Sequence, residues 1–304
     1  MANQSLTGPT TYTVESGDTL YGIAVRMYGN GEAYPLIQQA NQLTNPNLIQ
    51  VGQVLIIPAF ADSTISPDVA ETPDTDTGQS VEPVADSDAG APIPNERYGK
   101  LSIVGAPTDR PAAMHGDLNL KLRGYALTQS TLGLVDINGP HDAHAPQLAG
   151  LFADRRPANI SSVYAVYKWD WENSVPGALI TDYPVTLIGL RAQPSETVHV
   201  PPAGYDLGEG YQALVLFASS ERLTLKYTRE DNVIKGYTIH LENVHAEPSL
   251  LALYEQLNTR GRSELPALRA GQALGRARSN EIRVAIRDTG DFMDPRVRKD
   301  WWQG

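Results

Sequence analysis

The sequence predicts a multidomain protein with an N-terminal α+β module in the order βααβ, a disordered acidic linker, and a mainly-β C-terminal domain with about one helix. Its 304 residues are typical of two or more domains. Residues 61–96 hold nine acidic residues and no Lys or Arg, as disordered tethers do. After Arg97, short alternating segments dominate. We therefore place the two domains at residues 1–60 and 97–304.

The first half of the N-terminal module contains the signals of a strand, a turn and a helix. Tyr12-Thr13-Val14 alternates as a strand does, and Gly17 allows a sharp turn. Asp18 or Thr19 is placed to cap a helix with an apolar face. That face consists of Leu20, Ile23, Ala24 and Met27.

The second half of the module repeats these signals in reverse order. A second helix is expected from Tyr34 to Asn41, and Asn45-Pro46-Asn47 is a turn signal before a closing strand that ends at Pro58. The two turns then lie at one end of the module. Adjacent loops of this kind offer backbone N–H and C=O groups and small apolar surfaces to a ligand.

Gly17-Asp18-Thr19-Leu20 and the closing Gly52-Gln53-Val54-Leu55-Ile56-Ile57-Pro58 resemble a LysM module over residues 11–58. The resemblance implies binding of an N-acetylglucosamine polymer, either peptidoglycan or a chitin-like glycan. The family's two ligand loops correspond to Gly17, Asp18, Thr19, Leu20 and Tyr21, and to Asn45, Pro46, Asn47, Leu48 and Ile49. Alternatively, Leu20, Leu48 and Ile49 are core residues and the turns only connect elements.

Composition excludes several classes of protein. The absence of cysteine excludes disulfides, thiolate zinc sites and cysteine nucleophiles. No basic stripe suggests nucleic acid as a partner, and no apolar run is long enough for membrane insertion. The N-terminus lacks the pattern of a classical signal peptide, so we expect a protein made in the cytoplasm that functions at the cell wall or envelope, or in a macromolecular assembly.

The C-terminal domain is expected to be mainly β with one helix, from Pro248 to about Asn258. No internal repeat is evident. The candidate strands are Val185 to Leu190, Thr197 to Val200, Ala213 to Phe217, Leu223 to Tyr227, Tyr237 to Glu242 and Ile282 to Arg287.

Residues 200–296 resemble the end of a lysostaphin-type zinc endopeptidase domain, through Gly236-Tyr237-Thr238-Ile239-His240, Leu268-Arg269-Ala270-Gly271-Gln272 and Met293-Asp294-Pro295, in that order. In that family, histidines for catalysis and zinc binding stand where this chain has Gln256, Glu281 and Arg283. Glutamine is a poor zinc ligand, and arginine cannot coordinate a cation. The resemblance therefore implies a catalytically inactive relative with no catalytic residue and no cofactor.

Other candidate sites have simpler explanations. His115 with Asn119 is the nearest approximation to the family's remaining zinc ligands, and we do not expect it to bind metal. His141, Asp142 and His144 offer three possible ligands, but the neighbouring Gly139-Pro140 favours a solvated loop. No metal site is therefore predicted.

Four tryptophans remain to be placed. Trp169 and Trp171 are interpreted as core residues of the β domain, with sugar stacking or a protein interface as the alternative. Trp301 and Trp302 are expected to dock either on a partner or back onto the domain.

Three functions agree with these patterns. The first is a non-enzymatic glycan-binding protein in which the LysM module tethers an inactive peptidase-like domain. The second is a structural adaptor in a phage-tail-like or other surface assembly, with protein partners. The third is a peptidoglycan hydrolase with a non-standard metal site.

Overall fold

The computed structural model describes residues 10–15, 18–28, 34–41, 43, 49–58 and 91–303. The chain divides into two compact units, Met1–Val81 and Glu82–Gly304. Most of the predicted linker lies outside the described residues, so its disorder stays a prediction. Its last residues belong to the second unit, because the Ile93 amide donates to Glu247 and the Glu96 carboxylate accepts from Gln272 and Ala273.

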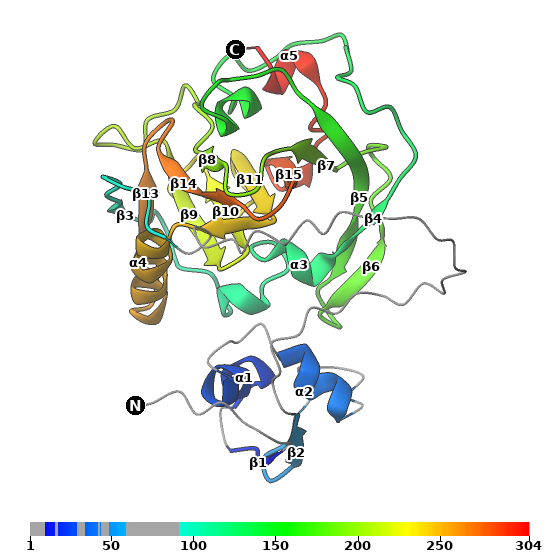
Figure 1. The fold of residues 1–304 in the computed structure, drawn as a ribbon, viewed down its shortest axis with the longest axis vertical. Coiled ribbons are helices and arrows are strands. Elements are labelled where there is room, and N and C mark those ends of the chain that lie inside the picture. Colours follow the sequence, from blue (N-terminus) through cyan, green and yellow to red (C-terminus); the bar gives the residue numbers. More distant parts are fainter. Residues whose placement is uncertain are drawn as a thin grey trace, which may run out of the picture. The chain divides into compact units, whose positions relative to one another are not determined.

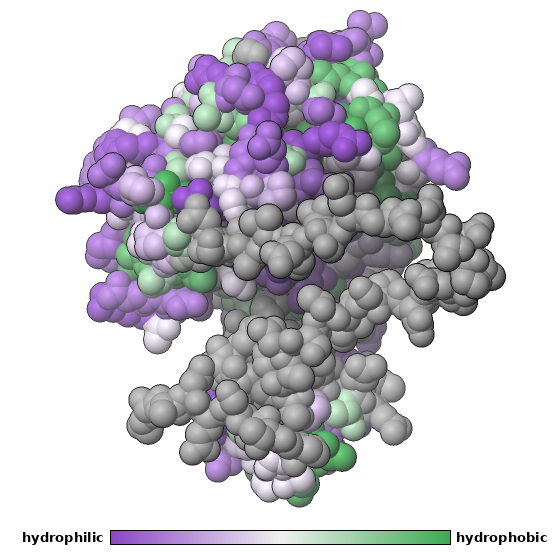
Figure 2. Space-filling model, viewed as in Figure 1, coloured by the Kyte–Doolittle hydropathy of each residue, from purple (hydrophilic) through white to green (hydrophobic). Residues whose placement is uncertain are grey.

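The described part of the N-terminal unit has the predicted βααβ order. Its elements are β1 (Thr10–Thr13), α1 (Leu20–Tyr28), α2 (Tyr34–Ala40) and β2 (Val54–Ile57). β1 and β2 pair in antiparallel orientation, and their inner face packs on both helices. The core contains Val14, Leu20, Ile23, Ala24, Ile37, Leu55 and Ile57. The outer face is exposed and partly apolar, and hydrophobic colour gathers at the β1–β2 end in Figure 2.

Asn41 connects the second helix to the closing strand. Its side-chain amide donates to the Ile37 and Ile56 carbonyl oxygens, and its Oδ1 accepts the Ile56 N–H. The side chain thereby pairs with the strand backbone as another strand would. Sequence reasoning placed Asn41 in the second helix but gave no sign of this role.

The C-terminal unit is a large antiparallel sheet with one long helix, α4 (Pro248–Thr259), as predicted (Figure 1). α4 begins at Glu247, which caps it by accepting the Leu250 N–H. Two further helices, α3 (Leu120–Arg123) and α5 (Arg298–Trp301), are single turns. None of the helices in the described parts of the chain is long and apolar enough to cross a membrane.

All six predicted strands are present, within one or two residues of the expected ends at most positions. They are β7 (Leu187–Arg191), β8 (Thr197–His199), β9 (Ala213–Ser219), β10 (Arg222–Lys226), β11 (Tyr237–Glu242) and β15 (Glu281–Asp288). The strands not predicted are β3 (Gly99–Ser102), β4 (Tyr125–Leu127), β5 (Ile160–Asp170), β6 (Val175–Leu179), β12 (Val244–Ala246), β13 (Glu264–Leu268), β14 (Ala273–Ala277) and β16 (Asp291–Phe292).

Strand order differs from sequence order. The main path runs β3-β13-β9-β10-β11-β15-β7-β5-β4, with β16 on β15 and β6 on β5. A small sheet, β12-β14-β8, completes the unit. The central strands β9, β10 and β11 are buried along their whole length, so both faces of the sheet are covered.

The two faces of the central strands differ in chemistry. One face is apolar, since Leu223 pairs with Leu241 and Leu241 with Val284. The other carries three cross-strand rows in which every side chain but Ala285 is polar, and we call it the polar face. The rows are Arg222, Glu242 and Arg283; Thr224, His240 and Ala285; and Lys226, Thr238 and Arg287.

Residues 112–127, which we call the covering segment, shield the polar face from solvent. Asp117 binds Arg287, and the Leu118 carbonyl oxygen accepts the Thr224 hydroxyl. Tyr125 accepts a hydrogen bond from Arg283. A sheet face with charged residues is buried here because Arg283 and Arg287 have partners on the covering segment, while Arg222 and Glu242 pair with each other.

The structure corrects the interpretation of Trp169 and Trp171 as core residues. Trp169 is only partly buried and Trp171 is 42% exposed, because both lie near the β5–β6 turn, beyond the sheet's packed centre. Trp301 is buried, and its indole N–H donates to the Asp294 carbonyl oxygen, while Trp302 donates to Pro295. These last two residues therefore dock back onto the domain.

Lys226 makes stability depend on pH. It is fully buried on β10, its Nζ donates to the Lys235 carbonyl oxygen, and burial lowers its pKa to about 8. Because the unfolded chain keeps the ordinary higher pKa, the folded state carries the cost of a buried charge below pH 8 and loses that cost as pH rises. We expect Lys226→Met to stabilise the protein by on the order of 1 to 3 kcal/mol near pH 7, and by less near pH 10.

Thermal unfolding at both pH values checks this expectation. Lys235→Met is the matched control, because the Lys235 side chain is 67% exposed. An equal stabilisation by Lys226→Met at both pH values would show that its charge state does not matter.

Candidate functional site

The first predicted loop of the N-terminal unit is held by the Asp18 carboxylate. Its Oδ2 accepts the Glu15 N–H and the Tyr12 hydroxyl, both at 2.8 Å, and its Oδ1 lies 3.3 Å from Arg26. Arg26 also donates to the Tyr12 hydroxyl oxygen. The Glu15 amide, with Tyr12 and Arg26, lowers the pKa of Asp18. This carboxylate therefore stays ionised and continues to accept the hydrogen bonds that hold the loop.

Thr19 is the residue that caps α1. Its Oγ1 accepts the Gly22 N–H at 3.0 Å, which is the usual N-cap geometry. Of the two residues predicted for this role, Asp18 therefore holds the loop and Thr19 holds the helix. Because both side chains are occupied within the module, we assign them to positioning the first loop.

The other predicted ligand residues fall into three groups. Leu20 is a core residue, 2% exposed, and Ile49 packs against the same core. Tyr21 lies on α1, and its side chain is outside the described part of the structure. The rest lie outside the described residues: Gly17, Asn45, Pro46, Asn47 and Leu48. For Leu20 and Ile49, the structure favours the alternative that they stabilise the module from inside.

The three positions aligned with histidines in the lysostaphin-type resemblance do not form a metal site. Gln256 is exposed on α4, which packs against β9 and β13. Glu281 and Arg283 lie on β15 and form an ion pair of 2.9 Å. An exposed amide and a carboxylate already paired with a guanidinium do not fit zinc, which requires free nitrogen, sulfur or oxygen ligands converging on one point.

Glu281 is the centre of a hydrogen-bonded cluster. Its Oε2 accepts the hydroxyls of Ser161 and Ser162 at 2.6 and 2.7 Å, and its Oε1 accepts Arg283. Partial burial opposes ionisation of Glu281, but these hydrogen bonds outweigh it and hold its pKa below the usual range. Nothing in the sequence indicated that β5, 120 residues away, supplies the serines.

The histidine candidates divide into His115, which is packed, and His141 and His144, which are exposed. The His115 ring meets Trp171 edge to face, and its Nδ1 accepts the Asp117 N–H. Asp142 accepts hydrogen bonds from the Tyr205 and Tyr237 hydroxyls, while His141 and His144 are exposed. Within the described ranges, no group of three or more His, Asp or Glu side chains could hold a metal ion.

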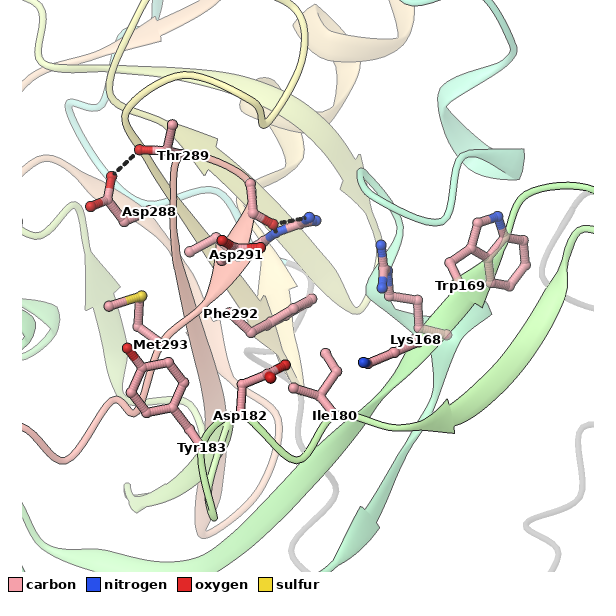
Figure 3. A pocket seen from close by; sticks show the side chains of 13 residues that line it. Lys168, Trp169, Ile180, Asp182, Tyr183, Asp288, Thr289, Asp291, Phe292 and Met293 are labelled. Atoms are coloured by element: carbon pink, nitrogen blue, oxygen red, sulfur yellow. Dashed lines mark hydrogen bonds between the residues drawn. The ribbon is translucent and has the colours of Figure 1, made fainter.

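A cavity of about 820 Å³ opens beside the polar face (Figure 3). Three segments form its walls: the end of β5, residues 180–183 after β6, and the β15–β16 hairpin. Arg123 and Arg287 line it as well, both nearly fully buried. Its volume lies within the range of small-molecule sites. Sequence reasoning gave no sign of it, because its walls come together only through the strand order.

Comparison with known proteins identifies the N-terminal unit. Residues 12–58 match the LysM domain family. LysM domains bind glycans that contain N-acetylglucosamine, such as peptidoglycan. No solved structure matches the chain. The described βααβ unit is therefore a LysM domain.

Three relatives share this part of the sequence. An esterase of Mycobacterium tuberculosis is 52% identical over 48 residues, 16% of this chain and 10% of that protein. A potassium binding protein of Escherichia coli is 51% identical over 49 residues, 16% of this chain and 33% of that protein. An uncharacterized protein of Deinococcus radiodurans is 50% identical over 52 residues, 17% of this chain and 21% of that protein. The chain thus matches a third or less of each relative.

Gly189 on β7 makes the Glu281 cluster possible. A Cβ at this position would lie 2.1 Å from the Ser162 hydroxyl oxygen and 2.4 Å from a Glu281 carboxylate oxygen. We expect Gly189→Ala to break the cluster and lower the free energy of unfolding by on the order of 1 to 3 kcal/mol, as overpacking does. Denaturant unfolding measures this loss.

Gly133→Ala is the control, because a Cβ there meets no atom within 4 Å. An unfolding midpoint of Gly189→Ala equal to that of Gly133→Ala would contradict the geometry.

Proposed function

We propose that the protein is a non-enzymatic glycan-binding protein, in which the LysM loops bind peptidoglycan or a chitin-like polymer and tether an inactive β domain. The match of residues 12–58 to the LysM family carries the proposal. The Asp18 hydrogen bonds support it, because they fix the backbone of the first loop before any ligand arrives. A preformed loop loses less entropy on binding.

The chemistry at the aligned positions supports the absence of peptidase activity. Arg283 is permanently charged, and it is bound to Glu281 and Tyr125. In the same row of the polar face, Arg222 and Glu242 form a second buried ion pair, of 3.2 Å. Side chains that satisfy one another in this way leave no ligand free for a metal and no general base.

Co-sedimentation of the full chain with purified peptidoglycan and with chitin tests the glycan site. We expect pelleting with at least one polymer, and a loss of about tenfold or more in affinity for Asn47→Ala, since one removed polar contact in a binding site has this effect. Asp18→Ala should lose binding as well, because the first loop loses its acceptor.

Thr11→Ala is the matched control, because Thr11 is exposed on β1 and belongs to neither loop. Thermal unfolding of each variant separates a lost contact from a lost fold. If the wild-type chain pellets with neither polymer, the glycan-binding function is wrong and the assembly adaptor becomes the better hypothesis.

Metal content and hydrolysis test the absence of enzyme activity. We expect zinc well below one equivalent after incubation with zinc and desalting, because Glu281 and Arg283 are paired with one another and Gln256 is a poor zinc ligand. The turbidity of a peptidoglycan suspension should stay constant in its presence. One equivalent of retained zinc together with release of soluble peptides would establish a hydrolase.

A further inference from the structure

Two buried arginines give the cavity of the C-terminal unit an excess of positive charge on one side. Arg123 and Arg287 are 6% and 4% exposed, and both donate to the same oxygen, Oδ1 of Asp117. Among the described residues, Asp117 is thus the one carboxylate to which both guanidinium groups donate. Their charges are therefore only partly neutralised, in a place that water hardly reaches.

Both arginines also have N–H donors without an acceptor among the described residues. Arg123 uses three donors, on Gly116, Tyr167 and Asp117, and Arg287 uses three, on Gly290 and Asp117. A guanidinium group has five N–H donors, so each has further donors without a partner among the described residues. Donors of this kind in a cavity wall are suited to a carboxylate.

Charged side chains of opposite sign line the open part of the cavity. Lys168 on β5 has no side-chain partner within the described ranges. Asp182 likewise has none there, and in Figure 3 it lies across the cavity from Lys168. Asp182 and Lys168 point toward one another across the open space.

Between the charged sides, the lining is apolar or aromatic. Ile180, Phe292 and Met293 contribute to it, and the Tyr183 ring stands beside them. This surface suits a short chain of methylene groups between two charged ends. An anion alone would face Asp182, and a cation alone would face the buried arginines.

We propose that this cavity binds a small zwitterion of the amino-acid class, with its carboxylate at Arg123, Arg287 and Lys168 and its ammonium group at Asp182. The ligand is a free small molecule, and its site is separate from the LysM loops. The inference goes beyond the proposed glycan function and does not depend on it.

Isothermal titration of the full chain with glycine, L-alanine, D-alanine, L-glutamate and L-lysine tests the proposal. We expect at least one of the five to bind with a Kd of about 1 mM or tighter. Two derivatives of that amino acid serve as comparisons. The N-acetyl derivative lacks the ammonium group, and the amino-acid amide lacks the carboxylate. Each should bind about tenfold more weakly or worse, because one charged hydrogen bond is lost.

Single substitutions identify the site. Lys168→Met and Asp182→Asn should each weaken binding about tenfold without a change in melting temperature, because neither side chain has a partner in the described structure. Lys100→Met and Asp206→Asn are the matched controls, and Lys100 lies on β3 at the other end of the sheet path. The LysM variant Asn47→Ala should bind the amino acid as the wild type does.

Three results would overturn the inference. The first is the absence of binding by all five amino acids. The second is binding that Lys168→Met and Asp182→Asn leave unchanged. The third is equal binding of the N-acetyl derivative, which would make the cavity an anion site. None of these results bears on glycan co-sedimentation, so the two proposals fail separately.

Discussion

The C-terminal unit depends on the carboxylate of Asp117. By accepting hydrogen bonds from Arg123 and Arg287, it joins the covering segment to the polar face. Loss of this carboxylate would leave two buried guanidinium groups without their counter-ion, and breaking a buried pair costs about 3 to 5 kcal/mol. Burial, with the charges of the same arginines, lowers the pKa of His240 well below its usual value, so this histidine stays neutral. The polar face and the cavity are therefore one electrostatic system.

The elements that sequence reasoning located are those whose signals are local. The turn and helix pattern around Thr19 predicted the cap and the first helix of the LysM domain, and the apolar stripe after Pro248 predicted α4 almost to the residue. The central strand Tyr237–Glu242 was predicted to the residue because it is bounded by Gly236 and Asn243, both with positive φ.

The elements that it missed depend on distant parts of the chain. β4 and β16 are only three and two residues long and exist because β5 and β15 pair with them. The burial of Arg287 could not be predicted from the sequence either, because its partner Asp117 is 170 residues earlier. For the proposed glycan site, the family pattern predicted the two loops, but only the structure separated Asp18, which holds the first loop, from Leu20, which fills the core. A sequence pattern does not show which distant strands and side chains pair, and these pairings decide the roles of the residues.

The strand order also sets the kinetics of folding. β3 pairs with β13, which lies more than 160 residues later, and the Tyr98 hydroxyl donates to Ala273 across a similar separation. Contacts of such high sequence separation form late and make folding slow, because a long loop must close first. Until β3 arrives, β13 has an unpaired edge, and such an edge is where a partly folded sheet aggregates. Refolding yield should therefore be limited by protein concentration, and the slow step belongs to the C-terminal unit.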